Sequence, residues 1–261
     1  MDLGIDGRTA LVLGAGSGLG EAIAQALAAE GVTVVAAGRT AASVDETAAA
    51  IRGTGGRAHA LTWDLADLDA IDARVRAAEE LAGPIDILVN NTGGPPPGAV
   101  VGQDRELWEA HFRAMVLSVI AITDRVVPGM RNRGWGRVIT STSSGVLAPI
   151  PGLGLSNTLR SALVGWSKTL AAEVGGEGVT ANVVVPGRIA TGRVASLDAA
   201  KAEREGRSTD EVTAASLAAI PAGRYGEPRE YGQVVAFLAG EAAAYVNGSV
   251  VRVDGGYVPA V

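Results

Sequence analysis

Apolar, β-branched runs alternate with Ala-rich or amphipathic stretches along the chain. The runs are short and continuously apolar, which is typical of strands buried on both faces of a parallel sheet. The stretches between them have the length of helices that cover such a sheet. The predicted strands are Thr9–Gly14, Val32–Ala37, Arg57–Thr62, Ile85–Asn90, Arg137–Thr142, Val179–Val184 and Ser249–Val253, and the predicted helices are Gly20–Glu30, Ala41–Arg52, Asp67–Leu81, Glu106–Met130, Ser156–Val174 and Arg229–Ala239.

This alternation predicts an α/β fold, a doubly wound (Rossmann-like) seven-stranded parallel sheet with helices on both faces. No internal repeat or linker marks a second unit, so residues 1–261 are expected to form a single dinucleotide-binding domain. Residues 192–228 break the rhythm with a charged, helix-forming stretch that contains no strand pattern. An insertion of this size is typical of a lid or substrate loop. A solvated helical excursion without a role is the alternative.

Composition and charge exclude several classes of function. The 22 basic and 28 acidic side chains give a net charge of −6, which provides no basic footprint for nucleic acid or anionic lipid. The absence of Cys excludes disulfides, thiol catalysis and iron–sulfur clusters, and no metal site is predicted. The N-terminus lacks a secretory pattern, and the uncharged stretch Val138–Leu159 is too rich in Ser, Thr, Gly and Pro for a membrane span. We therefore expect a cytoplasmic protein.

A glycine-rich turn lies between the first predicted strand and the first predicted helix. Its spacing is G-x-x-x-G-x-G through Gly14, Gly18 and Gly20, with Leu19 where the common G-x-G-x-x-G pattern has its last glycine. Glycines permit a tight turn and let backbone N–H groups approach a pyrophosphate at the helix N-terminus. We therefore predict a dinucleotide site that includes Ser17 as well as these four residues.

The end of the second predicted strand bears on which dinucleotide is bound. A site selective for NAD(H) has a carboxylate there that accepts hydrogen bonds from the ribose 2′-hydroxyl. Gly38 offers none, and the planar guanidinium of Arg39 can pair with a 2′-phosphate. NADP(H) is therefore favoured over NAD(H). The alternative is that Arg39 is a surface residue without a ligand.

Several short motifs, taken in order, resemble the short-chain dehydrogenase/reductase family across nearly the whole chain. More narrowly, the segments NNTGGPPPG, PGMRNRGWGRVITSTSS and LGLSNTLRSALVG resemble an atypical branch related to β-ketoacyl-carrier-protein reductases. The matching pieces are Gly14–Gly20, Asp64, Asn90–Gly93, Ser143, Pro186–Thr191 and Val253–Gly256.

This resemblance implies roles for further cofactor-binding residues. Asp64 and Leu65 would reach the adenine edge, and Asn91 and Gly93 would line the cofactor ribose, while Asn90 would brace the sheet. The nicotinamide end would be bound by Pro186, Gly187, Ile189 and Thr191, of which the last two would lie near the amide.

The family's chemistry rests on an Asn, a Ser, a Tyr, and a Lys four positions after the Tyr, and this sequence departs from that set. Ser143 matches the Ser, but Ser156 stands at the Tyr position, Arg160 at the Lys position and Met115 at the Asn position. Arg160 can still bond the cofactor ribose, but it cannot pass a proton on. A serine hydroxyl is a far weaker acid than a phenol. Because general acid–base catalysis contributes ~10²–10⁴-fold, the resemblance implies a slow reductase with catalytic residues Ser143, Ser156 and Arg160.

Other residues and other functions remain open at this point. His111 and Tyr225 are alternative proton donors. The first hypothesis is an NADP(H)-dependent oxidoreductase acting on a carbonyl or hydroxyl group of a small molecule. A non-redox isomerase, dehydratase or lyase on the same scaffold, or a weakly active nucleotide sensor, are the alternatives. A homo-oligomer, dimer or tetramer, is expected through the two long helices 106–130 and 156–174.

Overall fold

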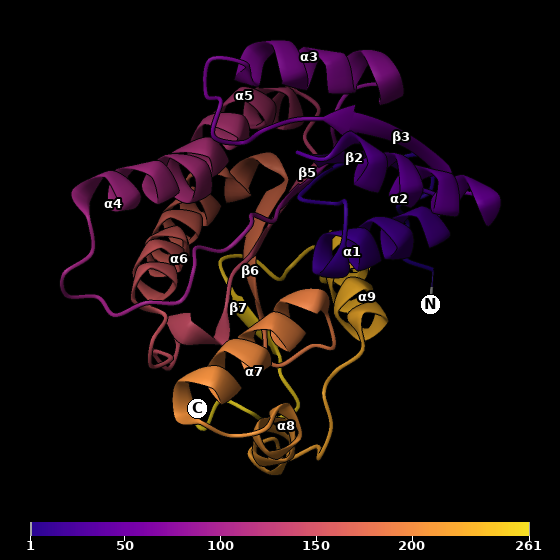
Figure 1. Cartoon of the computed structure of the whole chain (residues 1–261). Coiled ribbons are helices and arrows are strands. Elements are labelled where there is room, and N and C mark those ends of the chain that lie inside the picture. The colour runs from indigo at the N-terminus through magenta and orange to yellow at the C-terminus, as the bar shows by residue number, and fades with distance from the viewer. Residues whose placement is uncertain (1, 261) are drawn as a thin grey trace.

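A seven-stranded parallel sheet forms the centre of the protein, and the strands follow the order β3-β2-β1-β4-β5-β6-β7 (Figure 1). The computed structural model describes residues 2–260. Every neighbouring pair of strands is parallel, which confirms the predicted fold class. The strands are β1 Thr9–Leu13, β2 Thr33–Gly38, β3 Arg57–Thr62, β4 Ile87–Asn90, β5 Gly136–Ser141, β6 Val179–Pro186 and β7 Val250–Val253.

Helices cover both faces of this sheet. Apolar side chains of α1, α2 and α9 pack on one face, and those of α3, α5 and the C-terminal half of α6 pack on the other. The helices are α1 Gly18–Ala29, α2 Ala41–Gly53, α3 Ile71–Ala82, α4 Arg105–Phe112, α5 Ser118–Asn132, α6 Gly154–Val174, α7 Gly192–Glu205, α8 Thr209–Ala218 and α9 Pro228–Ala239.

The central strand explains why continuously apolar runs become strands here. Successive side chains of a strand point to opposite faces. In β1, Ala10 and Val12 belong to the cluster under α1 and α9, while Leu11 and Leu13 belong to the cluster under α3 and α5. All four are fully buried. A strand covered on both faces therefore needs apolar residues at every position, as the sequence has.

The stretch predicted as one helix from Glu106 to Met130 is divided. A π-helical turn, Arg113–Leu117, separates α4 from α5, and it contains Met115. The side chain of Met115 is buried against Leu155, Leu159 and Leu163 of α6. A widened turn of this kind adds one residue to a helix without ending it, so the apolar periodicity of the sequence does not reveal it.

The insertion at 192–228 folds as two helices, α7 and α8, which lie beside each other at the bottom of Figure 1. Both are capped by side chains that the sequence supplies at their starts. Thr191 accepts a hydrogen bond from the N–H of Val194, and Ser208 forms a reciprocal capping box with Glu211. Across residues 2–260, no helix is both long enough and apolar enough to cross a bilayer.

Candidate active site at the carboxyl edge of the sheet

The carboxyl ends of the parallel strands bring most of the predicted site residues to one edge of the sheet. The first crossover from β1 leads to β2 on one side, whereas β4 pairs with β1 on the other side. The strand order reverses between β1 and β4, and such a switch point forms a crevice in which α/β proteins bind ligands. The loops after β1 and after β4 are therefore neighbours, although more than seventy residues separate them.

The glycine-rich turn after β1 depends on two left-handed backbone positions and on one close approach. Gly14 and Gly18 have φ angles of 61° and 58°, in the left-handed region that favours glycine. A Cβ atom on Gly20 would lie 2.0 Å from the carbonyl oxygen of Gly14, so the helix could not sit this close with any side chain there. Leu19 packs on the α1–α9 cluster instead, which accounts for a leucine at this position.

The N-terminus of α1 is free to receive a ligand. The side chain of Ser17, its N-cap residue, is exposed and makes no capping hydrogen bond. The first N–H groups of a helix have no partner inside the helix, and the helix dipole favours an anion at this end. The turn and the helix start therefore fit a phosphate group.

The loop after β4 closes the other side of the crevice. The side-chain amide of Asn91 donates to the carbonyl oxygens of Leu13 and Gly14, both at 3.3 Å, and so holds the turn after β1. Asn90 donates to Thr123 of α5 and braces the sheet. Gly93 is exposed, with no atom within 4 Å of where its Cβ would lie. This loop therefore offers an open backbone surface beside the turn.

Two exposed residues follow the next strands along the same edge. Arg39 follows β2 and forms no ion pair or hydrogen bond with any other residue in the range 2–260. Gly38 before it packs against Val44 of α2 and leaves no room for a longer side chain. Asp64, after β3, accepts a hydrogen bond from the N–H of Ala66, while Leu65 is half-buried. Arg39 thus presents a cation to a ligand at this edge.

The loop after β6 brings the start of α7 to the glycine-rich turn. A Cβ on Gly18 would lie 3.5 Å from the Cγ2 atom of Thr191. Pro186 ends β6, and Gly187 lies so close to Asp254 that a Cβ there would be 2.6 Å from its Cα. Ile189 is buried and pairs with Gly226. The turn after β1 and the loop after β6 therefore face each other across the crevice.

Arg160 is the most unusual residue at this edge. Its side chain is buried, at 8% exposure of the residue, and it forms no ion pair with a carboxylate in the described range. It donates instead to three backbone carbonyls, those of Ser141 at 3.4 Å, Thr92 at 3.2 Å and Gly93 at 3.4 Å. Burial lowers the pKa of Arg160 from 12.5 to about 10, and the nearby charge of Arg193 acts in the same direction. It therefore remains a cation near neutral pH.

Two serines accompany Arg160: Ser143 follows the end of β5, and Ser156 lies in the first turn of α6. Ser143 is half-buried, and its hydroxyl accepts a hydrogen bond from the N–H of Gly145 at 3.2 Å. Ser156 is buried one helical turn before Arg160, and its hydroxyl forms no hydrogen bond with any of residues 2–260. The hydroxyl of Ser156 is thus available to a ligand.

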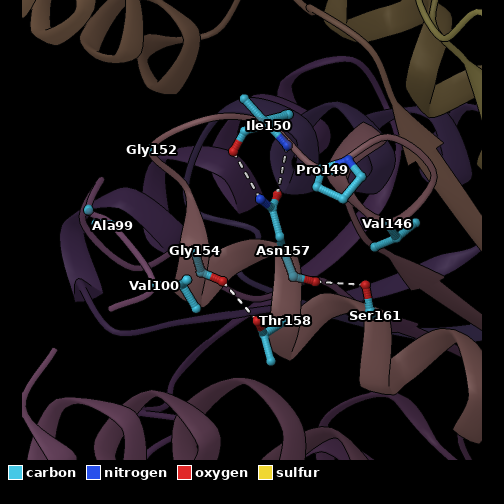
Figure 2. A pocket seen from close by; sticks show the side chains of 12 residues that line it. Ala99, Val100, Val146, Pro149, Ile150, Gly152, Gly154, Asn157, Thr158 and Ser161 are labelled. Carbon is cyan, nitrogen blue, oxygen red and sulfur yellow. Dashed lines mark hydrogen bonds between the residues drawn. The ribbon is translucent and has the colours of Figure 1, made fainter. Parts of the chain in front are cut away.

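Asn157 holds the segment between β5 and α6 in place, and it was not among the predicted site residues. Figure 2 shows its side-chain amide facing Ile150, with a hydrogen bond from the N–H of Ile150 at 3.3 Å and one to its carbonyl oxygen at 2.9 Å. The start of α6 is also joined to the loop after β4, since the N–H of Gly98 donates to the carbonyl of Gly152 and the N–H of Gly154 donates to the carbonyl of Gly98. A pocket of about 420 Å³ lies here, and it is lined by residues 98–100, 145, 146, 149, 150, 152 and 154 and by Asn157, Thr158 and Ser161 of α6.

The alternative proton donors are placed differently. The hydroxyl of Tyr225 donates to a carboxylate oxygen of Asp198 at 2.7 Å, and the other oxygen of Asp198 pairs with Arg188. This cluster ties α7 to the loop after β6 and to the segment before α9. His111 lies on α4, which has no buried residue. The structure thus gives Tyr225 a partner within the insertion.

Three residues near Arg160 escaped prediction from the sequence. Arg193 on α7 donates to the carbonyl of Pro95 at 2.8 Å. Tyr231 of α9 is fully buried, bonds Ser141 at 2.8 Å, and burial raises its pKa. Asn157 is the third. No short-range pattern signals Arg193 or Tyr231, because each meets the site from a distant part of the chain, but a polar Asn directly after Ser156 was a visible cue.

The residues along the carboxyl edge of the sheet fit a dinucleotide. The turn after β1 and the uncapped α1 suit a diphosphate, and Arg39 offers a cation at the place where a ribose phosphate would lie. The buried hydroxyl of Thr92 also has no hydrogen-bond partner in the described range, and Gly93 beside it is open. The donor set is cationic and backbone-rich, which matches a phosphorylated dinucleotide.

Comparison with known proteins agrees with this geometry. A family described as enoyl-(acyl carrier protein) reductase matches residues 14–258. The short-chain reductase protein NovJ of Streptomyces niveus is 37% identical over 249 residues, covering 95% of this chain and 92% of NovJ. The 3-oxoacyl-[acyl-carrier-protein] reductase of Vibrio harveyi is 32% identical over 256 residues, covering 97% and 98%. L-Sorbose reductase from Gluconobacter frateurii, solved with NADPH and L-sorbose, superimposes with a TM-score of 0.93 at 30% identity, covering 100% of both chains.

Proposed function

Because the chain belongs to the short-chain dehydrogenase/reductase family, we propose that it is an NADP(H)-dependent oxidoreductase that acts on a carbonyl or hydroxyl group of a small molecule. The single observation that carries the proposal is the buried Arg160 guanidinium. It pairs with no carboxylate among residues 2–260 and lies against Thr92 and Gly93, at the switch point where a dinucleotide would bind. A buried cation without an anion is costly, and a ligand at this place offsets the cost.

The cofactor is assigned to the residues along the carboxyl edge. The backbone from Gly14 to Gly20 would hold the diphosphate, and Arg39 the 2′-phosphate. L-Sorbose reductase, which was solved with NADPH, supports the choice of NADP(H). When bound, the cofactor donates or accepts the hydride that interconverts a carbonyl and an alcohol. The remaining contacts are assigned to Asp64, Leu65, Asn91, Gly93, Arg160, Pro186, Gly187, Ile189 and Thr191.

Ser143, Ser156 and Arg160 are proposed as the catalytic residues, with Ser156 and Arg160 in the family's Tyr and Lys positions. Ser143 would orient the substrate oxygen. Ser156, whose hydroxyl is free in the described range, would hydrogen-bond that oxygen or hold a water that protonates it. Arg160 would stabilise negative charge that develops there, without itself moving a proton. Such a site favours slow turnover, because no strong general acid takes part.

The insertion of α7 and α8 is proposed as the substrate lid. Three side chains join it to the rest of the protein: Arg188 in the loop after β6, Asp198 on α7, and Tyr225 before α9. Asp198 is buried and accepts from both partners. Motion of α7 would therefore pivot on this cluster.

A homo-oligomer, dimer or tetramer, is proposed through α4 to α6. Phe112 and Leu117, at 41% and 39% exposure, border the apolar cluster that α4 and the π-turn form with α6. Exposed apolar residues that extend an apolar cluster to the surface in this way are what a partner subunit would cover. Light scattering of the protein in solution measures the mass and would contradict the proposal if the protein were monomeric.

Steady-state kinetics tests the reaction. NADPH-dependent reduction of a panel of ketones and aldehydes should be measurable, and Ser156→Ala should lower kcat by up to about 100-fold. Thr169→Ala removes an exposed hydroxyl from the same helix and serves as the matched control. Tight NADPH binding with no turnover of any substrate would contradict the proposal and favour a nucleotide-binding protein.

A further inference from the structure

Two arginine side chains approach one point in the loop after β4. A Cβ atom on Gly94 would lie 3.1 Å from the Nη2 atom of Arg193 and 3.7 Å from the Nη2 atom of Arg160. Arg160 comes from the second turn of α6, and Arg193 comes from the first turn of α7, so two different helices deliver the two groups. Gly94 itself is exposed, whereas Arg160 is buried.

Nothing in the described part of the chain balances the two charges. Within residues 2–260 neither guanidinium forms an ion pair, and the acceptors that they contact are backbone carbonyls, including that of Pro95 for Arg193. Burial lowers the pKa of both arginines, and the charge of Arg193 acts on Arg160 as a like charge. Two partly desolvated cations beside each other favour an anion between them.

Glycine at position 94 lets the two guanidiniums lie this close to the backbone. No positive φ angle requires glycine there, unlike at Gly14 or Gly18. The close approach of the two guanidiniums is what a side chain would disturb. Two guanidiniums therefore converge beside the backbone of Gly94, and the fork of N–H donors that a guanidinium presents matches the planar geometry of a carboxylate.

We propose that Arg193, with the positive charge of Arg160 beside it, binds a carboxylate of the substrate, so that the enzyme acts on oxo acids or hydroxy acids in preference to neutral ketones or alcohols. This inference rests on the proposed oxidoreductase function and specifies its substrate class. Because Arg193 belongs to α7, the carboxylate also draws the proposed lid onto the loop after β4.

The other anion that could occupy this point is a phosphate of the cofactor. The uncapped start of α1 and the glycine turn already provide a diphosphate site, and Thr191, not Arg193, is the residue of the loop after β6 that lies beside Gly18. Arg193 faces Gly94 instead. The placement therefore favours the substrate as the source of the anion, and the experiment must separate the two sources.

Acetoacetate and its methyl ester provide the test, since they share the reacting ketone, and the ester replaces the negative charge of the carboxylate with a neutral group that is larger by one methyl. Calorimetry on the protein saturated with NADP⁺ should show tighter binding of acetoacetate than of methyl acetoacetate. Arg193→Met should weaken acetoacetate binding by about 10- to 100-fold, the loss expected for hydrogen bonds to a charged group. Binding of the ester and of NADPH should be unchanged. In steady-state kinetics, Arg193→Met should raise the KM for acetoacetate and leave the KM for methyl acetoacetate unchanged.

Two further variants guard against a folding defect and a general charge effect. Arg204→Met removes an exposed positive charge from the same helix and should leave the preference for acetoacetate intact. Gly94→Ala adds one methyl group at the shared point, without removing a charge, and should weaken acetoacetate binding selectively. This variant decides the matter if Arg193→Met does not fold.

Three outcomes would overturn the inference. The first is equal binding of acetoacetate and its ester in the unchanged protein. The second is an equal loss for both compounds in Arg193→Met, which would mark Arg193 as a structural tie to Pro95. The third is weakened NADPH binding with an unchanged acid preference, which would assign Arg193 to the cofactor. If NADPH binds but no carbonyl is reduced, the proposed function fails, while acetoacetate binding still reports on the arginine pair.

Discussion

Replacement of Arg160 with methionine separates a residue kept for a ligand from one kept for stability. Methionine preserves most of the side-chain volume and removes the guanidinium, which is buried and donates to the carbonyls of Ser141, Thr92 and Gly93. If the charge serves a bound anion, its removal should leave the ligand-free protein folded. If the charge serves the fold, its removal should strongly lower the free energy of unfolding.

Arg160 affects the free energy of unfolding in two opposing ways, through the cost of burying its charge and through its hydrogen bonds. Burial lowers the pKa of Arg160 from 12.5 to about 10, so the charged form is disfavoured in the folded protein by about 3 kcal/mol. The three hydrogen bonds, at 3.2 to 3.4 Å, are long, and together they contribute about 2–4 kcal/mol. Because the two effects nearly cancel, Arg160→Met should change the free energy of unfolding by no more than about 2 kcal/mol in either direction.

Urea unfolding with and without NADPH measures both quantities. A ligand at 100 times its Kd stabilises the folded state by about 2.7 kcal/mol, and the unchanged protein should show a gain of this order. Arg160→Met should lose part of that gain, because the Arg160 guanidinium is also expected to bond the cofactor ribose.

Arg137→Met is the matched control, because Arg137 is also buried but stacks on Trp135, 4.2 Å from the ring centre. It should lose stability, since the cation–π contact alone contributes about 0.5–2 kcal/mol, and should keep the NADPH response. A loss of more than about 4 kcal/mol in ligand-free Arg160→Met, or a full NADPH response in it, would refute the reasoning.

Three further predictions concern the cofactor, pH and the glycine turn. Arg39→Ala should weaken NADPH binding about 10- to 100-fold and leave NADH binding unchanged, as fluorescence titration with each would measure. Hydrogen bonds from Arg224 and from the Glu227 backbone lower the pKa of Glu230 to about 2. The stability that the Glu230 carboxylate contributes is therefore present above its unfolded pKa and is lost as pH falls through about 2. The Tm difference between Glu230→Gln and the unchanged protein should shrink below about pH 4.5. Gly20→Ala should destabilise the protein because its Cβ would meet the Gly14 carbonyl, whereas Gly53→Ala, in open space at the end of α2, should be neutral or stabilising by up to about 1 kcal/mol in thermal unfolding.

The sheet could be predicted from the sequence because its signal is local. Each strand is a short apolar run, and a central strand such as β1 is buried on both faces, so every residue of it carries the signal. Helix boundaries were predicted less closely, since α6 begins at Gly154 and α3 at Ile71, each a few residues from the expected start. The π-turn at Arg113–Leu117 leaves no trace in the periodicity.

Some features of the candidate site could likewise be predicted from the sequence, and others could not. The turn at Gly14–Gly20 is contiguous, so its glycines could be recognised from the sequence alone. The approach of Arg193 to Arg160 joins α7 to α6 across thirty-three residues of sequence, and no spacing rule links them. The clamp of Asn157 on Ile150 likewise depends on how the segment preceding α6 folds back. Contacts of this kind follow from tertiary packing, which a one-dimensional pattern does not encode.

Transfer of deuterium from NADPH labelled at both C4 hydrogens to a carbonyl compound tests the central claim most directly, because it detects even slow hydride transfer. Mass spectrometry of the alcohol formed from acetoacetate should show one deuterium per molecule, with far less product when labelled NADH replaces NADPH, and none with Arg160→Met. NADPH that binds tightly yet delivers no deuterium to acetoacetate, its methyl ester or any other ketone or aldehyde would contradict the account.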